Sequence, residues 1–197
     1  MRKSTIKKIK DLNLDEKIIL KEIAADKKMV QWHYDKMKAT MKEKLSEKEI
    51  WDRINSIIIR DNIFNAAMEK FEKSFEYSLD SSEIENIINM LKQMFPDRDL
   101  KILENIAEKM IIKEMIFEVL AKEWNIEVNN NEVEKALDSY YKFTNESIKN
   151  YLEDKEKFEN IRKTIFEEKM ANEIIKRIKY EFDLPKQKPN TEEKEKK

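Results

Sequence analysis

Glycine is absent from all 197 residues of this chain, and its absence excludes several classes of function. Glycine normally makes up about 7% of a globular protein, so roughly a dozen would be expected. Without glycine there is no Gly-rich phosphate-binding loop, no dinucleotide-binding fingerprint and no nucleophile elbow. Tight hairpins, which need positive φ at adjacent residues, become rare, so a β-rich fold is disfavoured. The function must therefore come from the shape and surface of a helical scaffold.

Cysteine is also absent, and His33 is the only histidine of the chain. Disulfides, cysteine-based zinc sites and thiol nucleophiles are therefore excluded. A di-iron carboxylate site needs a Glu-x-x-His element on each of two helices, which one histidine cannot provide. His33 lies between Trp32 and Tyr34, and we interpret it as an ordinary surface or interface residue. We expect no metal site, no cofactor and no catalytic residue, and hence no enzymatic function.

The charges are nearly balanced, with 40 basic and 41 acidic side chains. A dedicated nucleic-acid-binding protein usually carries a basic excess on one face. Charged residues make up 41% of the chain and hydrophobic residues 40%, the near-equal split that amphipathic helices require. No run approaches the roughly 20 apolar residues of a membrane span, and no apolar segment of signal-peptide length follows the basic start. We therefore expect a cytoplasmic protein with no membrane partner.

Apolar spacing and helix-start signals predict an all-α protein. Helix starts with capping residues are predicted at Ser46, Asp80 and Asn129. Asparagines take the place of the missing glycines between residues 125 and 131, because Asn tolerates the left-handed conformation. We expect strand structure to be limited to an incidental bridge near 127–128. The predicted helices cover residues 15–45 (one or two helices), 47–77, 80–96, 98–125, 131–142, 145–152 (opened by Thr144) and 154–182.

The helix predicted over residues 98–125 is the candidate central element. Between Met110 and Leu120 it is apolar almost all round, and the charged residues that interrupt it are Lys113, Glu114 and Glu118. A helix with so narrow a polar strip is expected to be surrounded by other helices. We therefore expect Ile112, Ile116 and Leu120 to be buried.

Residues 106–178 resemble the C-terminal, substrate-cradling domain of the ribosome-associated chaperone trigger factor. The segments that carry the resemblance are AEKMIIKEMIFEVLAKEWNIEV, NNNEVEKALDSYYK and YLEDKEKFENIRKTIFEEKMANEII. The chain is even more similar to the stand-alone trigger-factor-like proteins of mycoplasmas. The abundance of Lys, Asn and Ile, which suggests an AT-rich genome, agrees with that source. The glycine-rich isomerase domain and the glycine-containing ribosome-docking loop of trigger factor cannot be present here.

The resemblance implies a fold like that of the trigger factor C-terminal domain, an elongated multi-helix body with protruding helical arms. It also implies an ATP-independent holdase that binds unfolded or nascent polypeptides in an apolar cradle between those arms. It implies three regions: a basic arm with a helical extension (1–48), the chaperone domain (49–184) and a disordered charged tail (185–197). A second hypothesis from the same features is a helical adaptor or assembly scaffold that binds one specific protein partner. A holdase should bind several unrelated unfolded proteins, whereas an adaptor should bind one partner.

Methionine and phenylalanine on the helical stripes are the candidate substrate-binding residues, since flexible apolar side chains adapt to varied partners. The alternative for each is an ordinary place in the core. The candidates for the cradle are Phe64, Met68, Phe71, Phe75, Met90, Met94 and Phe95, with Met37 and Met41 on the N-terminal helix.

The basic arm is a candidate for weak contact with the ribosome or another RNA. Its cations are Arg2, Lys3, Lys7, Lys8 and Lys10. The alternative is an arm that is merely solvated.

Overall fold

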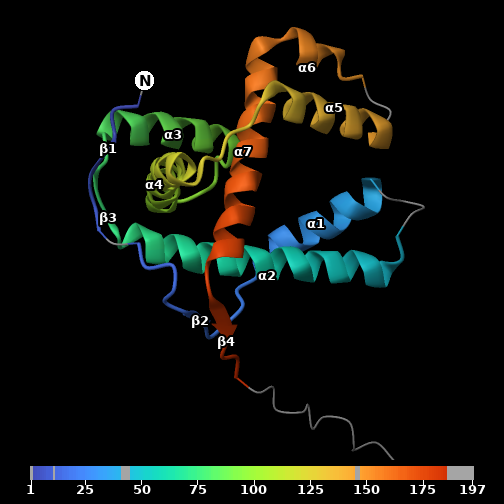
Figure 1. The fold of residues 1–197 in the computed structure, drawn as a ribbon. Coiled ribbons are helices and arrows are strands. Elements are labelled where there is room, and N and C mark those ends of the chain that lie inside the picture. The colour runs from blue at the N-terminus through green and yellow to red at the C-terminus, as the bar shows by residue number, and fades with distance from the viewer. Residues whose placement is uncertain (1, 11, 41–44, 145–146, 186–197) are drawn as a thin grey trace, which may run out of the picture. The chain divides into compact units, whose positions relative to one another are not determined.

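The computed structural model describes residues 2–10, 12–40, 45–144 and 147–185. These residues form seven helices and four short strands, so the predicted all-α fold is confirmed (Figure 1). The elongated shape and the projecting arms stay predictions. The helices are α1 (Lys27–Thr40), α2 (Glu47–Glu72), α3 (Ser81–Met94), α4 (Leu100–Trp124), α5 (Asn130–Thr144), α6 (Lys149–Glu153) and α7 (Lys155–Arg177). The strands are β1 (Thr5–Ile9), β2 (Ile18–Leu20), β3 (Phe75–Ser78) and β4 (Tyr180–Phe182).

The chain divides into two compact units. The first combines Met1–Leu12 with Met68–Arg177, and the second combines Asn13–Ala67 with Ile178–Lys197. This division differs from the predicted boundary after residue 48, because the N-terminal segment belongs to the same unit as the central helices. The tail from 186 to 197, which we expected to be disordered, lies outside the described residues.

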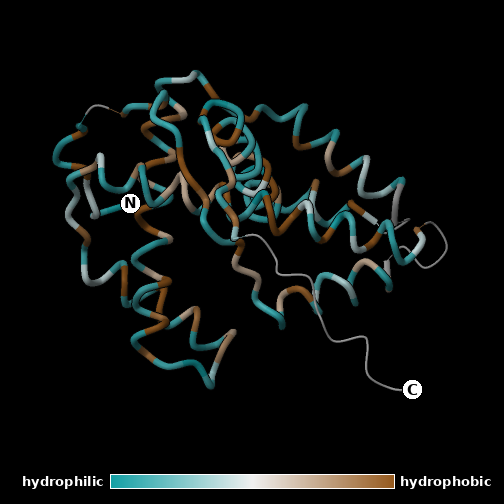
Figure 2. The backbone as a smooth tube through the Cα atoms, turned by 90° about the horizontal axis from the view of Figure 1, so that it is seen from below, coloured by the Kyte–Doolittle hydropathy of each residue, from teal (hydrophilic) through white to brown (hydrophobic). Residues whose placement is uncertain are grey.

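Helix α4 forms the centre of the first unit. Ile112, Ile116 and Leu120 are all buried, as the sequence predicts. In Figure 1, α4 is seen end on, with α3 along one side of it and α7 along another. Ile88 and Leu91 of α3 form one buried cluster with residues of α4. Along the helices, hydrophobic and hydrophilic residues alternate as amphipathic segments require (Figure 2).

The helix ends carry the capping interactions that the sequence predicts. Asp80 accepts hydrogen bonds from two backbone N–H groups of the first turn of α3. Asn129 and Glu132 exchange side-chain to backbone hydrogen bonds of 3.1 Å at the start of α5. Ser46 and Glu49 exchange equivalent bonds of 2.7 and 3.3 Å before α2. Asn125 ends α4 in the left-handed conformation, with φ of 53°. Asparagine therefore does here what glycine commonly does after a helix.

The helix predicted over residues 47–77 ends at Glu72, and this part of the prediction is wrong. A turn follows, and β3 pairs antiparallel with β1 of the N-terminal segment. The segment FEYS alternates between inward and outward side chains, with Phe75 and Tyr77 less exposed than Glu76 and Ser78. A period of two favours a strand over a helix. The N-terminal arm is consequently part of a small sheet.

The last predicted helix is also too long. It ends at Arg177, and β4 pairs in parallel with β2, which lies in the segment predicted as helical over 15–45. Ion pairs Lys17–Glu181 (2.6 Å) and Asp15–Lys179 (2.7 Å) flank this pairing in the second unit. The two helices predicted over 131–142 and 145–152 have different bounds in the structure: α5 continues to Thr144, and α6 begins only at Lys149.

Candidate functional site

Two of the predicted cradle residues are core residues. Phe71 is 1% exposed and Phe75 is 5% exposed, so the expectation that they line an open surface is wrong. Phe71 is buried in the last turn of α2. Phe75 lies beyond the turn that follows α2, on β3, where its side chain points inward. Apolar stripes that look too long to bury on one helix are therefore divided between a helix and a strand.

The remaining candidates on α1 and α2 are intermediate. Met37 and Phe64 in the second unit and Met68 in the first are each partly buried. Met41 lies outside the described residues. Met37, Phe64 and Met68 offer no large exposed apolar surface.

Met90, Met94 and Phe95 are exposed, as the cradle hypothesis requires. They lie at the C-terminal end of α3, and two further exposed apolar side chains, Leu100 and Ile102, begin α4 after the connecting turn. The exposed fractions of these five residues lie between 43% and 63%. We call this group the α3–α4 apolar patch.

The side chains of the patch are not needed for the packing of α3 against α4. The inner stripe of α3, which includes Ile84, Ile88 and Leu91, already packs against α4. Met90 and Met94 are one turn apart on a different stripe. Charged residues of both signs lie close to the patch in the sequence, including Lys92, Asp97 and Arg98, and the Arg98 guanidinium lies 5.8 Å from the centroid of the Phe95 ring. Exposed apolar side chains that form a contiguous surface usually mark an interaction site, which makes this group a candidate.

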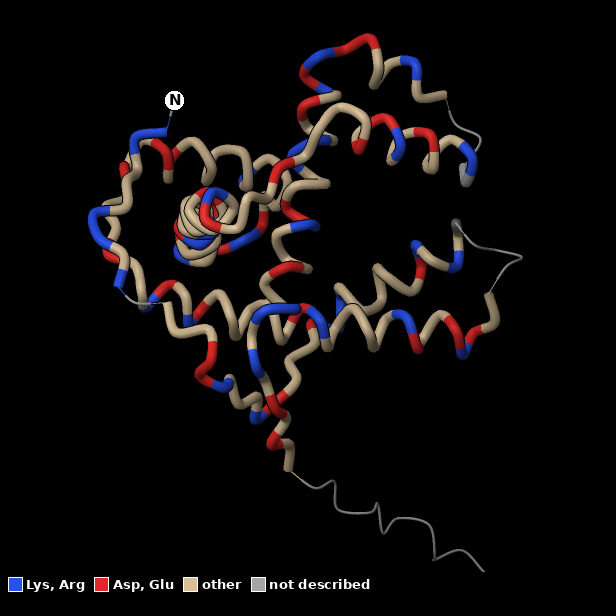
Figure 3. The backbone as a smooth tube through the Cα atoms, in the orientation of Figure 1, with Lys and Arg blue, Asp and Glu red and all other residues tan. Residues whose placement is uncertain are grey.

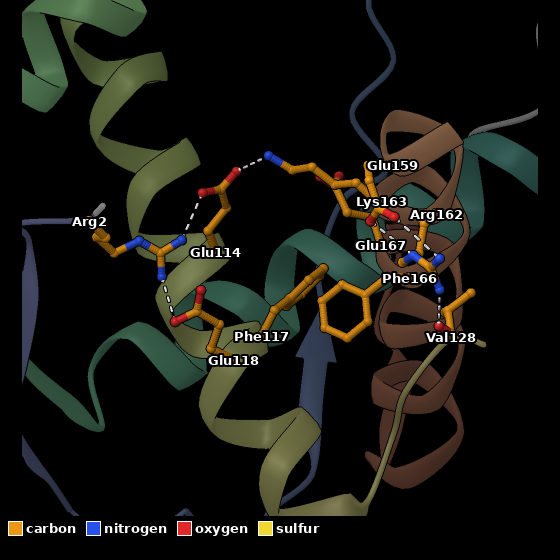
Figure 4. A pocket seen from close by; sticks show the side chains of 10 residues that line it. All are labelled: Arg2, Glu114, Phe117, Glu118, Val128, Glu159, Arg162, Lys163, Phe166 and Glu167. Atoms are coloured by element: carbon orange, nitrogen blue, oxygen red, sulfur yellow. Dashed lines mark hydrogen bonds and ion pairs between the residues drawn. The ribbon is translucent and has the colours of Figure 1, made fainter. Parts of the chain in front are cut away.

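A pocket in the first unit is a second candidate site, which we call the α4–α7 pocket (Figure 4). It encloses about 340 Å³. Figure 4 shows Phe117 of α4 and Phe166 of α7 at its centre, with charged side chains around them. The two rings meet edge to face, with centroids 6.4 Å apart and planes at 77°. The residues that line it are Arg2, Glu114, Phe117, Glu118, Val128, Glu159, Arg162, Lys163, Phe166 and Glu167.

The two helices contribute strips of the same spacing to this pocket. Positions 113, 114, 117 and 118 on α4 face positions 162, 163, 166 and 167 on α7, because residues four apart share one side of a helix. Lys113 pairs with Glu167 at 2.7 Å, and Glu114 pairs with Lys163. The polar strip that interrupts α4 therefore has a matching polar strip on its neighbour.

Arg162 of α7 connects the edge of the pocket to the segment that follows α4. Its guanidinium donates to the backbone carbonyl of Val128 (2.7 Å), to the amide oxygen of Asn130 (2.6 Å) and to Glu159 (2.9 Å). These bonds satisfy donors on several sides of the guanidinium and hold it at the pocket edge.

The N-terminal segment supplies another wall. Arg2 lies 2.8 Å from a carboxylate oxygen of Glu114 and 2.8 Å from one of Glu118. Ser4 is buried and its hydroxyl accepts a hydrogen bond from the backbone N–H of Asp80 (2.9 Å). The backbone N–H groups of Lys3 and Ser4 donate to Glu83. Side-chain and backbone contacts thus hold this segment against α3 and α4.

Glu114 is ionised by its neighbours despite its partial burial. Burial raises the pKa of the Glu114 carboxyl, but the hydrogen bonds and charges of Lys163 and Arg2 outweigh it and hold the pKa below its ordinary value. The pocket therefore keeps this carboxylate negative and paired at neutral pH.

The basic arm is not the free cationic segment that the sequence suggests. Arg2 is paired with two glutamates, Lys3 Nζ donates to the Ser82 hydroxyl (2.9 Å), and Lys10 pairs with Glu76 at 3.2 Å. Lys7 and Lys8 are exposed on β1. Across the described residues, basic and acidic residues are interspersed (Figure 3). The predicted contact with the ribosome or another RNA stays a prediction.

Sequence reasoning singled out the α3 end of the apolar patch but missed the pocket. The available signal was the set Lys113, Glu114 and Glu118 on an otherwise apolar helix, together with charges of the same spacing on α7. Among the described residues, no group of three or more His, Cys, Asp or Glu side chains could hold a metal ion. Within the same part of the chain, no helix is long and apolar enough to cross a membrane.

Two mycoplasma proteins are similar to the chain over nearly its whole length. The uncharacterized protein MG377 of Mycoplasma genitalium is 35% identical over 189 residues, which cover 95% of this chain and 97% of the relative. The MG377 homolog of Mycoplasma pneumoniae has the same identity and coverage. No protein-family model matches the chain.

A solved structure shares the fold. The crystal structure of the hypothetical Mycoplasma protein MPN555 matches with a TM-score of 0.82 at 34% identity, and the match covers 91% of each chain. These relatives come from mycoplasmas, but none of their names states an activity. The resemblance to trigger factor therefore stays a prediction.

Proposed function

The chain belongs to the family of the mycoplasma protein MG377, and we propose that it is an ATP-independent chaperone of the cytoplasm. In this proposal it is a holdase: it binds unfolded or nascent polypeptides and keeps them from aggregating. The resemblance of residues 106–178 to the substrate-cradling domain of trigger factor supports the proposal.

The observation that carries the proposal is the α3–α4 apolar patch. Its five side chains are all large and apolar, and two of them are methionines. Methionine has three rotatable bonds and a polarizable sulfur, so it packs against apolar groups of different shapes. A surface of this kind suits a protein that must bind many sequences weakly. Charges of both signs around the patch favour no single client charge.

Binding should be stoichiometric. A chain without a Gly-rich phosphate loop is not expected to drive release with a nucleotide, so clients are held by mass action. The expected dissociation constants are micromolar, equivalent to about -8 kcal/mol.

The test is aggregation of a chemically denatured protein in the presence of increasing amounts of this protein. We expect suppression in proportion to the protein added. The combined variant Met90→Ser, Met94→Ser and Phe95→Ser should lose this protection and keep its helical circular dichroism signal, since these side chains are exposed.

A matched variant on the same helix controls for the number of substitutions. Glu85→Ser, Asn86→Ser and Asn89→Ser change three exposed polar residues of α3 and should leave protection unchanged. If the patch variant protects clients as well as the unaltered protein does, the patch is not the binding surface. If the unaltered protein protects none of several unrelated clients, the protein is not a holdase and the adaptor hypothesis replaces it.

A further inference from the structure

We propose that the α4–α7 pocket binds one uncharged aromatic side chain of an extended polypeptide segment. This inference rests on the proposed chaperone function for the source of the segment. It goes beyond that function because it assigns a second binding site and the chemistry of its occupant.

The size of the pocket limits the occupant. Its volume of about 340 Å³ lies at the lower end of the roughly 300–1,000 Å³ range of ligand pockets. A space of this size suits one large side chain and not a folded surface. The pocket is partly open to solvent, so a side chain can enter while its backbone stays outside.

The apolar centre of the pocket favours an aromatic ring. Phe117 is almost completely buried, and Phe166 is partly exposed. These two rings already meet edge to face, and Figure 4 shows them at the centre of the lining residues. A third ring against Phe166 can add another such contact, which contributes about 0.5–1.5 kcal/mol beyond the area buried. Val128 extends the apolar surface beside them.

The charges around the pocket disfavour a charged occupant. Every charged side chain of the lining already has a partner of opposite sign: Arg2 with Glu114 and Glu118, Lys163 with Glu114, Arg162 with Glu159, and Glu167 with Lys113. A basic or acidic ligand would compete with a lining residue for its partner of opposite sign. An uncharged side chain leaves all the pairs in place.

The rim can bind a polypeptide backbone. Glu118, Glu159 and Lys163 have side chains that are more than half exposed. Carboxylate oxygens can accept from backbone N–H groups, and the lysine ammonium can donate to a carbonyl oxygen. The pocket thus combines an apolar centre with a polar rim, as peptide-binding sites require.

The pocket can be tested with capped amino-acid amides, which measure it without any client protein. We expect saturation-transfer NMR to detect binding of N-acetyl-phenylalaninamide, and much weaker binding of the corresponding arginine and glutamate amides. Phe166→Ala removes one ring of the pocket from a partly exposed position and should weaken binding of the phenylalanine amide about tenfold. Ile165→Ala changes the neighbouring half-buried residue of α7, which does not line the pocket, and should leave binding unchanged.

Three outcomes would overturn the proposal: no binding of the phenylalanine amide, equal binding by Phe166→Ala, or binding of the arginine amide as strong as that of phenylalanine. The result is separable from the aggregation test. If the amide binds at Phe166 but no client is protected, the pocket stands and the holdase function fails. If clients are protected and the amide does not bind, the holdase function stands and the pocket proposal fails.

Discussion

Burial separates apolar residues of this protein that look alike in the sequence. Phe71 and Phe75 continue the helical spacing of the apolar stripe that begins at Phe64, and the sequence alone suggests that this stripe is exposed. Both residues are nevertheless buried in the core. Met90 and Met94 belong to a helix whose inner stripe is already occupied by isoleucine and leucine, and they stay exposed. The side of its helix or strand on which a residue lies, and not the residue type, decides which methionines and phenylalanines are available for binding.

Truncation should reveal this difference in the free energy of unfolding. Ile116→Ala and Leu120→Ala should each cost about 2–5 kcal/mol, and Phe71→Ala about 3–5 kcal/mol, because each removes fully buried atoms and leaves a cavity. Met94→Ala should cost less than about 1 kcal/mol, since its side chain is already mostly in water. Urea unfolding followed by circular dichroism measures all four. Equal losses for Met94 and the buried residues would mean that the α3–α4 apolar patch is part of the core.

At the scale of the elements, helices were predictable and short strands were not. Caps at Ser46, Asp80 and Asn129 fix three helix starts through local side-chain to backbone hydrogen bonds, so neighbouring residues are enough to predict them. The partner of β3 lies in the N-terminal segment, far away in the sequence. Four residues such as FEYS form a strand only because that distant partner exists, and their period of two is easily taken for the end of an amphipathic helix.

The β1–β3 pair should give the protein a distinctive alkaline titration. Tyr77 on β3 donates a hydrogen bond to Glu72 (2.8 Å). Burial, that hydrogen bond, and the charges of Glu72 and Glu108 raise the pKa of Tyr77 from 10.0 to about 12. Because the folded pKa is above the unfolded one, the neutral phenol stabilises the fold fully below about pH 10. This contribution is lost as the pH rises from 10 toward 12.

Tyrosinate absorbance measures this directly. One of the six tyrosines should ionise later than the others, and Tyr77→Phe should remove that late component. The variant should also lose less stability between pH 10 and pH 12 than the unaltered protein does. A late component that persists in Tyr77→Phe would assign the raised pKa to another tyrosine.

For the molecule as a whole, the candidate sites were predictable only in part. Hydrophobic patterning identified the exposed end of α3, because surplus apolar residues are visible along one helix. The α4–α7 pocket depends on two helices about 50 residues apart and on Arg2 at the other end of the chain. Matching spacings on the two helices hint at such a pairing, but only the fold brings the three segments together.

The central claim is that an unfolded polypeptide contacts the α3–α4 apolar patch, and site-specific photo-crosslinking tests it most directly. A photoreactive amino acid is placed at Met94, or, as a control, at Asn172, an exposed polar position of α7 in the same unit. Each protein is irradiated with the same client in its denatured and its native form. We predict adducts from Met94 with the denatured client, and none from Asn172 or with the native client. Equal yields from both positions, or no adduct from Met94, would contradict the claim.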